Sequence, residues 1–115
     1  MVTYIPEYGD IIWLDFDPQK GREMQKRRPA LILSPTSYNQ KTHLALCVPI
    51  TSKIKGYPFE VIIDNEKIKG AILSDQLRSL DWYSRNASFI TTLSMQQIQD
   101  VLAKIRCLLE YTQET

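Results

Sequence analysis

Three residues of this sequence stand out for the chemistry that their side chains offer: an acid, an arginine and a threonine. Residues 18–57 carry eight lysines and arginines against a single acid, Glu23. A local charge excess of this size is typical of a surface that binds a polyanion, although a solvated face balanced by acids elsewhere explains the count equally well. Arg28 closes the first of two basic loops and Thr51 opens the second. A phosphate bound to this surface would therefore lie near both side chains.

These residue types match what is needed to break an RNA phosphodiester bond without a metal ion. The ribose 2′-hydroxyl is then the nucleophile, so the site needs a base for its proton and a cation for the charge that develops on the phosphate. Glu23 is the nearby carboxylate and hence the candidate general base. Arg28 can hold two phosphate oxygens in a bidentate fork, and Thr51 can donate a hydrogen bond to the same phosphate. The pattern does not identify the group that protonates the leaving 5′-oxygen.

Each of these residues also has a purely structural explanation. Glu23 could neutralise its basic neighbours, Arg28 could be a surface arginine before a strand, and Thr51 could cap a turn with its hydroxyl. The aromatic residues that could stack on unpaired bases are Trp13, Phe16, Tyr38, Tyr57 and Phe59. Aromatic side chains at strand spacing pack more often in a core, and Phe16 beside Leu14 fits that pattern.

The apolar pattern predicts the strands that would hold such a site. Residues 11–16 alternate between two faces and predict a half-buried strand, while 30–34 and 44–50 are short apolar runs. If these two runs pair antiparallel, residue 28 lies near residue 51. Arg28 and Thr51 would then share one rim of the sheet, with the loop acid able to fold over them.

The rest of the chain predicts more strands and one helix. Further strands are expected at 59–63, 70–74, 77–82 and 87–92. Ser94 and Gln97 fit a capping box, and the apolar residues that follow recur at helical spacing up to about Glu110. Short strands, polar loops and one terminal amphipathic helix predict a mainly β (α+β) fold. We expect a small antiparallel β-barrel with a helix packed on it, in a single domain spanning residues 1–115.

Composition argues against several other classes of protein. Cys47 and Cys107 match no zinc pattern, and the sole histidine, His43, has no partner ligand nearby, so we expect neither a metal site nor a cofactor. Both cysteines are predicted to be small core residues that stay reduced. No apolar run approaches the roughly 20 residues of a membrane helix, and the N-terminus lacks a signal pattern. We therefore expect a cytoplasmic protein with no membrane contact.

Several short motifs follow one another in an order known from one family. They are Gly9-Asp10-Ile11-Ile12-Trp13, Arg28-Pro29-Ala30, Val48-Pro49-Ile50-Thr51 and Ser74-Asp75-Gln76. With these motifs the sequence resembles the MazF/PemK family of toxin endoribonucleases over nearly its whole length. The resemblance implies an SH3-like barrel with a C-terminal helix, a homodimer, and metal-independent cleavage of single-stranded RNA (mRNA) at short specific sequences. It also implies neutralisation by a cognate antitoxin, whose acidic segment would cover the basic groove.

The resemblance also implies roles for particular residues. The family's catalytic arginine and threonine correspond to Arg28 and Thr51, and its loop acid corresponds to Glu23. Together with the basic loops, the positions where family members contact RNA give a set of candidate RNA-binding residues. They are Phe16, Lys20, Arg22, Lys26, Arg27, Asn39, Lys53, Lys55, Asp75 and Gln76. Met24 and Lys26 stand where the family usually has glutamine and glycine, which puts sequence specificity in question more than activity.

Two other interpretations stay open. A non-enzymatic toxin similar to CcdB, which acts on DNA gyrase by protein–protein contact, would share the barrel. That protein works through its C-terminal end, including a tryptophan, whereas residues 110–115 of this chain contain none. The third interpretation is a degenerate family member that only binds RNA.

Overall fold

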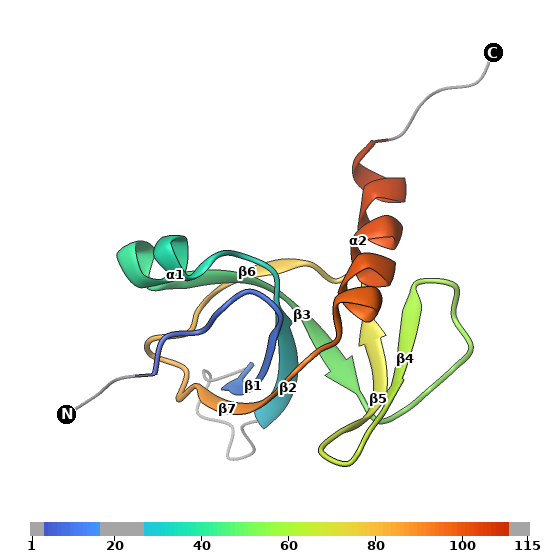
Figure 1. Cartoon of the computed structure of the whole chain (residues 1–115), viewed down its shortest axis with the longest axis horizontal. Helices are drawn as coiled ribbons and strands as arrows, with labels where there is room; N and C mark the ends of the chain where they lie inside the picture. The colour runs from blue at the N-terminus through green and yellow to red at the C-terminus, as the bar shows by residue number, and fades with distance from the viewer. Residues whose placement is uncertain (1–3, 17–26, 111–115) are drawn as a thin grey trace.

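The structure is a computed structural model that describes residues 4–16 and 27–110. Within these residues, seven strands form one antiparallel sheet that curls into a half-open barrel, and a C-terminal helix packs on it (Figure 1). The elements in chain order are β1 (Asp10–Asp15), β2 (Arg27–Ile32), α1 (Thr36–Thr42), β3 (Leu44–Thr51), β4 (Glu60–Asp64), β5 (Lys69–Leu73), β6 (Arg78–Asp81), β7 (Ser88–Thr92) and α2 (Met95–Leu109). The strand order is β4-β5-β3-β2-β1-β7, with β6 paired to β3 off this path. The predicted fold class is confirmed.

Strand β3 is the centre of the sheet because it pairs with three other strands. One of its edges is occupied by β2. Its other edge is shared, since Leu44–Cys47 pair with β6 and the last two residues, Ile50 and Thr51, pair with β5. One strand edge can serve two partners that point in different directions only if the strand bends between them. This bend curls the sheet.

The register between β2 and β3 confirms the predicted antiparallel pairing. Ala30 lies opposite Pro49, and Leu31 lies opposite Val48. The same register, carried two residues further, sets Arg28 opposite Thr51. The two candidate catalytic residues are therefore brought to one rim of the sheet by backbone pairing, although 23 positions separate them in the sequence.

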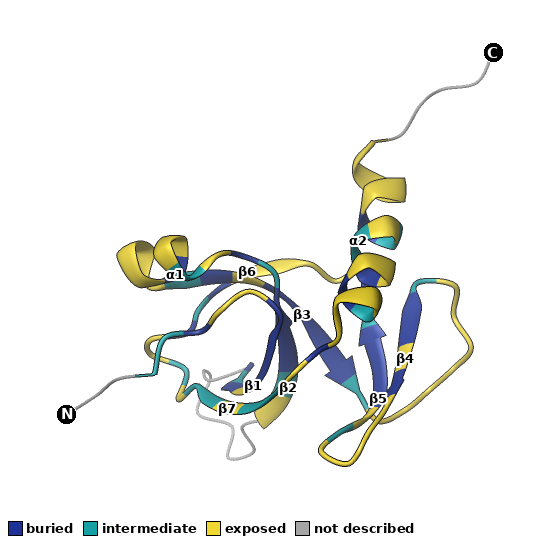
Figure 2. Ribbon diagram, in the orientation of Figure 1, coloured by how far each residue is buried: buried dark blue, intermediate teal, exposed yellow. Residues whose placement is uncertain are grey.

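Because the sheet curls, both faces of its central strands are buried (Figure 2). Ile11 and Leu31 belong to a core that β4, β5 and α2 close. Ile12 and Ala30 belong to a second core on the opposite face, inside the curl. The strand predicted for 11–16 is confirmed by β1, but its predicted half-buried pattern is wrong, since both Ile11 and Ile12 are fully buried and Trp13 is 39 % exposed.

Helix α2 begins as the sequence predicts but buries only part of its apolar stripe. The Ser94 hydroxyl accepts a hydrogen bond from the Gln97 N–H at 3.2 Å, while the Gln97 side chain donates to the carbonyl of Ile62. Ile98, Val101 and Ile105 are buried against the sheet. The last turn stands clear of the sheet in Figure 1, and Leu109 is 71 % exposed. None of the described helices is long and apolar enough to cross a membrane.

The two cysteines differ in their surroundings. Cys47 is buried in β3, and this burial raises the pKa of its thiol to about 12. Cys107 is exposed on α2, so the prediction that it is a core residue is wrong. Helical spacing placed it near the apolar stripe, but this part of the helix extends beyond the sheet that would cover it.

Asn39 ties helix α1 to the rest of the fold and is fully buried. Its side-chain oxygen accepts from the Ser34 hydroxyl at 2.6 Å, and its side-chain nitrogen donates to the carbonyls of Pro6 and Ser34 at 2.8 and 3.1 Å. Its backbone carbonyl accepts from the Trp82 indole at 3.0 Å. An amide whose bonds are used in this way has no face left for a nucleotide, so the predicted contact between Asn39 and RNA is wrong.

We expect Asn39→Ala to lower the free energy of unfolding by about 2–4 kcal/mol, because it leaves the Ser34 hydroxyl proton without an acceptor and two buried carbonyls without their donor. Urea denaturation measures this loss. Gln40→Ala on the exposed side of the same helix is the matched control and should change stability by less than about 0.5 kcal/mol. Equal effects of the two substitutions would contradict a structural role for Asn39.

Candidate functional site

Arg28 and Thr51 line one groove of about 480 Å³ beside the rim of the sheet. Its walls come from the ends of β2 and β3, from Trp13 of β1 and from the turn between β4 and β5. Five lysines and arginines line this groove, which we call the cationic groove, and no acid does so among the described residues. These cations are Arg27, Arg28, Lys53, Lys67 and Lys69. Clustering of one sign of charge in a concave surface suits a polyanion.

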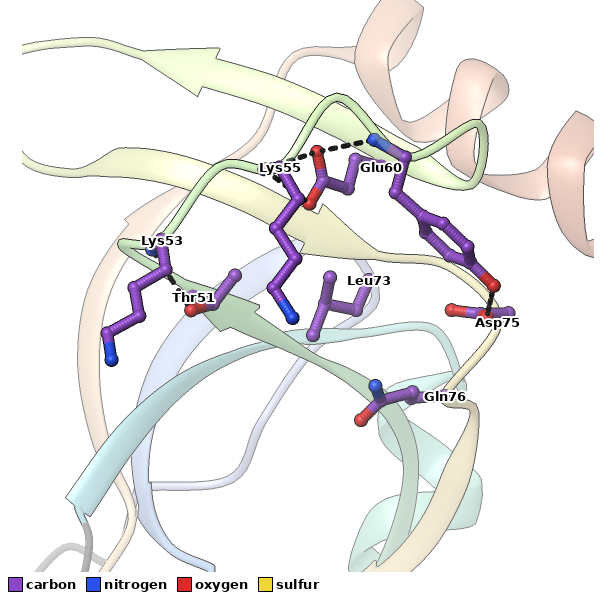
Figure 3. A pocket seen from close by; sticks show the side chains of 8 residues that line it. Thr51, Lys53, Lys55, Glu60, Leu73, Asp75 and Gln76 are labelled. Carbon is purple, nitrogen blue, oxygen red and sulfur yellow. Dashed lines mark hydrogen bonds between the residues drawn. The ribbon is translucent and has the colours of Figure 1, made fainter.

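A second hollow of about 290 Å³ adjoins the first (Figure 3). We call it the Asp75 pocket, and its lining residues are Thr51, Lys53, Lys55, Tyr57, Glu60, Leu73, Asp75 and Gln76. Thr51 and Lys53 line both hollows, so the two are neighbours at these residues. The fold thus brings together Arg28, Thr51 and five of the predicted binding residues, which come from separate parts of the chain.

The Thr51 hydroxyl is partly occupied by a local turn. Its oxygen accepts a hydrogen bond from the Lys53 N–H at 3.1 Å. The structural explanation considered for this residue, a turn-capping hydroxyl, is therefore confirmed. The same geometry leaves the hydroxyl proton able to donate, because the cap uses the oxygen only as an acceptor. The two roles are compatible.

The comparisons with known proteins agree with this arrangement. A family model described as "PemK-like, MazF-like toxin of type II toxin-antitoxin system" matches residues 7–109. This chain belongs to the PemK/MazF toxin family. The predicted resemblance is confirmed, and the CcdB-like alternative is set aside because the matching family and its curated relatives are endoribonuclease toxins of another type.

Relatives in the PemK/MazF family match over most of their length. The endoribonuclease toxin MazF of Escherichia coli K12 is 46% identical over 106 residues, which cover 92% of this chain and 96% of that protein. The endoribonuclease PemK of Escherichia coli is 31% identical over 108 residues, which cover 90% and 81%. The MazE–MazF crystal structure (Form-II) from Deinococcus radiodurans matches with a TM-score of 0.89 at 42% identity, covering 96% of this chain and 100% of that one.

Phe16 is mostly covered by its neighbours in the fold. It is only 8 % exposed and belongs to the core inside the curl of the sheet. The Arg78 guanidinium lies over its ring, 5.5 Å from the centroid. Because both the core and this arginine cover most of the ring, the structure argues against the predicted contact between Phe16 and RNA, and the alternation of Phe16 with Leu14 was the signal for burial.

Arg27 and Arg28 differ although they are adjacent on β2. The Arg27 guanidinium donates to the Asp15 carboxylate at 3.1 Å and to the Ser88 hydroxyl at 2.9 Å. These contacts join β2 to β1 and β7 and offset much of the charge of Arg27. Arg28 is exposed at the rim, in the position opposite Thr51. Arg28 is thus the better placed of the two to bind a phosphate.

Asp75 and Gln76 follow β5 and close one end of the Asp75 pocket (Figure 3). The Tyr57 hydroxyl donates to Asp75 Oδ2 at 2.6 Å, and this hydrogen bond raises the pKa of Tyr57. Tyr57, considered above as a stacking residue, is therefore held by its hydroxyl. The second carboxylate oxygen of Asp75 is buried without a partner in the described part of the chain.

Four of the predicted site residues lie outside the described residues, namely Lys20, Arg22, Glu23 and Lys26. In contrast, Lys67 and Lys69 line the cationic groove, and sequence reasoning missed both. They belong to a turn between strands that looked like ordinary solvent-exposed chain. To predict that Lys67 and Lys69 line this groove, one would need to know that β5 pairs with the end of β3.

Gly70 allows β5 to approach Thr51 closely. Its φ is +152°, and a Cβ at this position would lie 2.3 Å from the Thr51 carbonyl oxygen. Such a distance is a severe overlap with backbone, so any side chain here would push β5 and Thr51 apart. The position of Thr51 therefore depends on Gly70, which lines neither the cationic groove nor the Asp75 pocket.

We expect Gly70→Ala to lower the free energy of unfolding by about 3 kcal/mol, since it adds both an overlap and backbone strain. Gly56→Ala is the control, because Gly56 also has a positive φ of +79° but a Cβ there meets nothing within 4 Å. That control should cost only about 1 kcal/mol, the strain alone. Denaturant unfolding of both variants would contradict the close approach if their losses were equal.

Proposed function

We propose that this protein cleaves single-stranded RNA by attack of the ribose 2′-hydroxyl, without a metal ion, at sites set by short sequences. The observation that carries the proposal is that Arg28 and Thr51 line the same groove, which is lined by five cations. Membership of the PemK/MazF family and 46% identity to an endoribonuclease toxin support the same activity. The function is then that of a toxin that blocks translation by cutting mRNA in the cytoplasm.

In the proposed reaction, the 2′-oxygen attacks the adjacent phosphorus and the bond from phosphorus to the 5′-oxygen breaks. The products are a 2′,3′-cyclic phosphate and a 5′-oxygen that takes up a proton from solvent water to become a free 5′-hydroxyl. Arg28 binds the non-bridging oxygens and stabilises the charge that grows on them, and Thr51 donates its hydroxyl proton in a hydrogen bond to the same phosphate. Glu23 is proposed to accept the proton of the 2′-hydroxyl.

The proposed substrate is single-stranded because the site combines a phosphate-binding groove with a pocket of base size. Lys53 and Lys55 would neutralise neighbouring phosphates, while Asp75 and Gln76 would contact a base in the Asp75 pocket. Such contacts need base edges that are not already paired in a duplex. As a carboxylate that lines this pocket, Asp75 can accept a hydrogen bond from an amino or imino group of a base.

A cognate antitoxin is the proposed protein partner, as in the MazE–MazF complex from Deinococcus radiodurans. An acidic segment of that antitoxin would complement the cationic groove and exclude RNA from it. We further propose that the active toxin is a homodimer, as the family resemblance implies. In this arrangement, the same positive charge that attracts RNA also attracts the inhibitor.

We expect Arg28→Ala to reduce RNA cleavage by about 100-fold to 1,000-fold, because one preorganised charge-stabilising group is lost. The measurement is cleavage of a mixed-sequence single-stranded RNA by purified protein in EDTA, with the cut ends mapped. Arg106→Ala, at an exposed position in the last turn of α2, is the control for loss of a positive charge and should cut normally. Near-normal cleavage by Arg28→Ala, or failure of the wild type to cut in EDTA, would contradict the proposal.

We expect RNA binding to weaken steeply as salt rises, because each phosphate that a lysine or arginine neutralises releases a counterion. For a single strand, the slope of log affinity against log salt is about −0.7 per contact. A 2′-deoxy oligonucleotide, which lacks the nucleophile, allows binding to be measured without cleavage. Lys69→Ala should make the slope shallower by one such contact, whereas Lys41→Ala on exposed α1 should not. Identical slopes for the two variants would remove the turn between β4 and β5 from the interface.

A further inference from the structure

The segment between β3 and β4 carries Lys53, Lys55 and Tyr57, all of which line the Asp75 pocket. Residues 53–57 have no helix or strand hydrogen bonds to hold them. Ordering each residue of this segment costs conformational entropy. Because the segment has no strand partner, other contacts must hold its three pocket-lining side chains in place. The structure shows that the support is a carboxylate.

Glu60, the first residue of β4, is 9 % exposed and turns its carboxylate back into this segment (Figure 3). Its Oε1 accepts from the N–H groups of Gly56 at 3.0 Å and of Lys55 and Tyr57 at 3.3 Å. Its Oε2 accepts from the Lys55 N–H at 3.1 Å. Three successive backbone donors thus converge on one carboxylate, an arrangement that binds an anion well.

Two further contacts hold the same segment from other sides. The Tyr57 hydroxyl donates to Asp75 at 2.6 Å, and the Lys104 ammonium donates to the Pro58 carbonyl at 2.7 Å. These contacts come from the end of β5 and from α2. Of the three supports, only Glu60 bonds the backbone of Lys55 itself. The direction in which the Lys55 side chain leaves the segment therefore depends on Glu60.

The charge of Glu60 makes this placement informative. An acid that lines a pocket for a polyanion should weaken binding by repulsion, so a site selected only for charge would not contain it. The described contacts of its two oxygens are with backbone N–H groups. The negative charge of Glu60 therefore serves to orient the segment. The binding energy gained from the ordered segment has to exceed the electrostatic repulsion between Glu60 and the polyanion.

We infer that Glu60 is a positioning residue for RNA binding, which acts by fixing the part of the segment that carries Lys55 and Tyr57 over the Asp75 pocket. It touches neither the scissile phosphate nor the nucleophile, so it acts through the backbone of Lys55, Gly56 and Tyr57. This inference rests on the proposed function. It predicts that loss of Glu60 weakens RNA binding, which is opposite in sign to what removal of a negative charge alone would do.

Glu60→Gln is the decisive variant, because it keeps the size of the side chain but removes the charge and turns one acceptor into a donor. We expect the Kd for a 2′-deoxy oligonucleotide and the KM for RNA to rise about tenfold, with kcat within about threefold of wild type. The salt slope should become shallower by about one phosphate contact. Glu66→Gln, in the exposed turn between β4 and β5, makes the same charge change and should bind RNA as tightly as wild type or more tightly.

A second pair of variants separates position from charge. Glu60→Asp keeps the charge but is one methylene shorter, so we expect it to bind RNA more weakly than wild type. The double variant Glu60→Gln with Lys55→Ala should bind no more than about twofold more weakly than Lys55→Ala alone, because the two residues act as one unit. Tighter RNA binding by Glu60→Gln, or wild-type binding by Glu60→Asp, would overturn the inference.

Backbone amide exchange tests the inference independently of activity. In Glu60→Gln, the amides of Lys55, Gly56 and Tyr57 should exchange faster, while those in β2 and β3 stay protected. Unchanged exchange at these three amides would overturn the inference even if binding falls. If the wild type fails to cut RNA but the exchange result holds, the proposed function fails while the anchoring of the segment by Glu60 stands.

Discussion

The whole site depends on the pairing of β3 along both of its edges. Thr51 is the last residue of this strand, and it is held between Ala71 of β5 on one side and the line of β2 on the other. Hydrogen-bonded strands keep a fixed spacing, so the position of the Thr51 hydroxyl is set by backbone rather than by side-chain packing. A slip of one residue between β2 and β3 would exchange the two cores and move Arg28 away from Thr51. The stability of the two cores and the geometry of the site therefore both depend on the register between β2 and β3.

The charges that surround this site are brought together against their mutual repulsion. Arg28 comes from β2, Lys53 from the segment after β3, and Lys67 and Lys69 from the end of the hairpin formed by β4 and β5. Backbone pairing holds these elements in place, so the repulsion cannot relax by moving the cations far apart. A bound polyanion would relieve it, and in the proposed function that polyanion is either RNA or an acidic segment of the antitoxin. Under that proposal, inhibition would need no second binding surface.

The sequence predicted those features that depend on local pattern and on one strand pairing. The register that joins Arg28 to Thr51, the Ser94 cap and the C-terminal helix belong to this group. The prediction failed where the outcome depends on how far one element covers another, since nothing local shows that Cys107 lies beyond the edge of the sheet. Side chains whose partners are backbone groups were the hardest to predict. Asn39 and Glu60 are both of this kind, and their contacts exist only after the chain has folded.

Thr51 lines both the cationic groove and the Asp75 pocket, so a single residue joins the two hollows. Within the proposed function, the residue that touches the broken bond is also a wall of the space that holds a neighbouring base. The number of nucleotides between the base that is read and the bond that is cut is then a fixed dimension of the fold. Substitutions at the far end of the pocket, around Gln76, can change which base is accepted, but they leave the distance from that base to the cut unchanged.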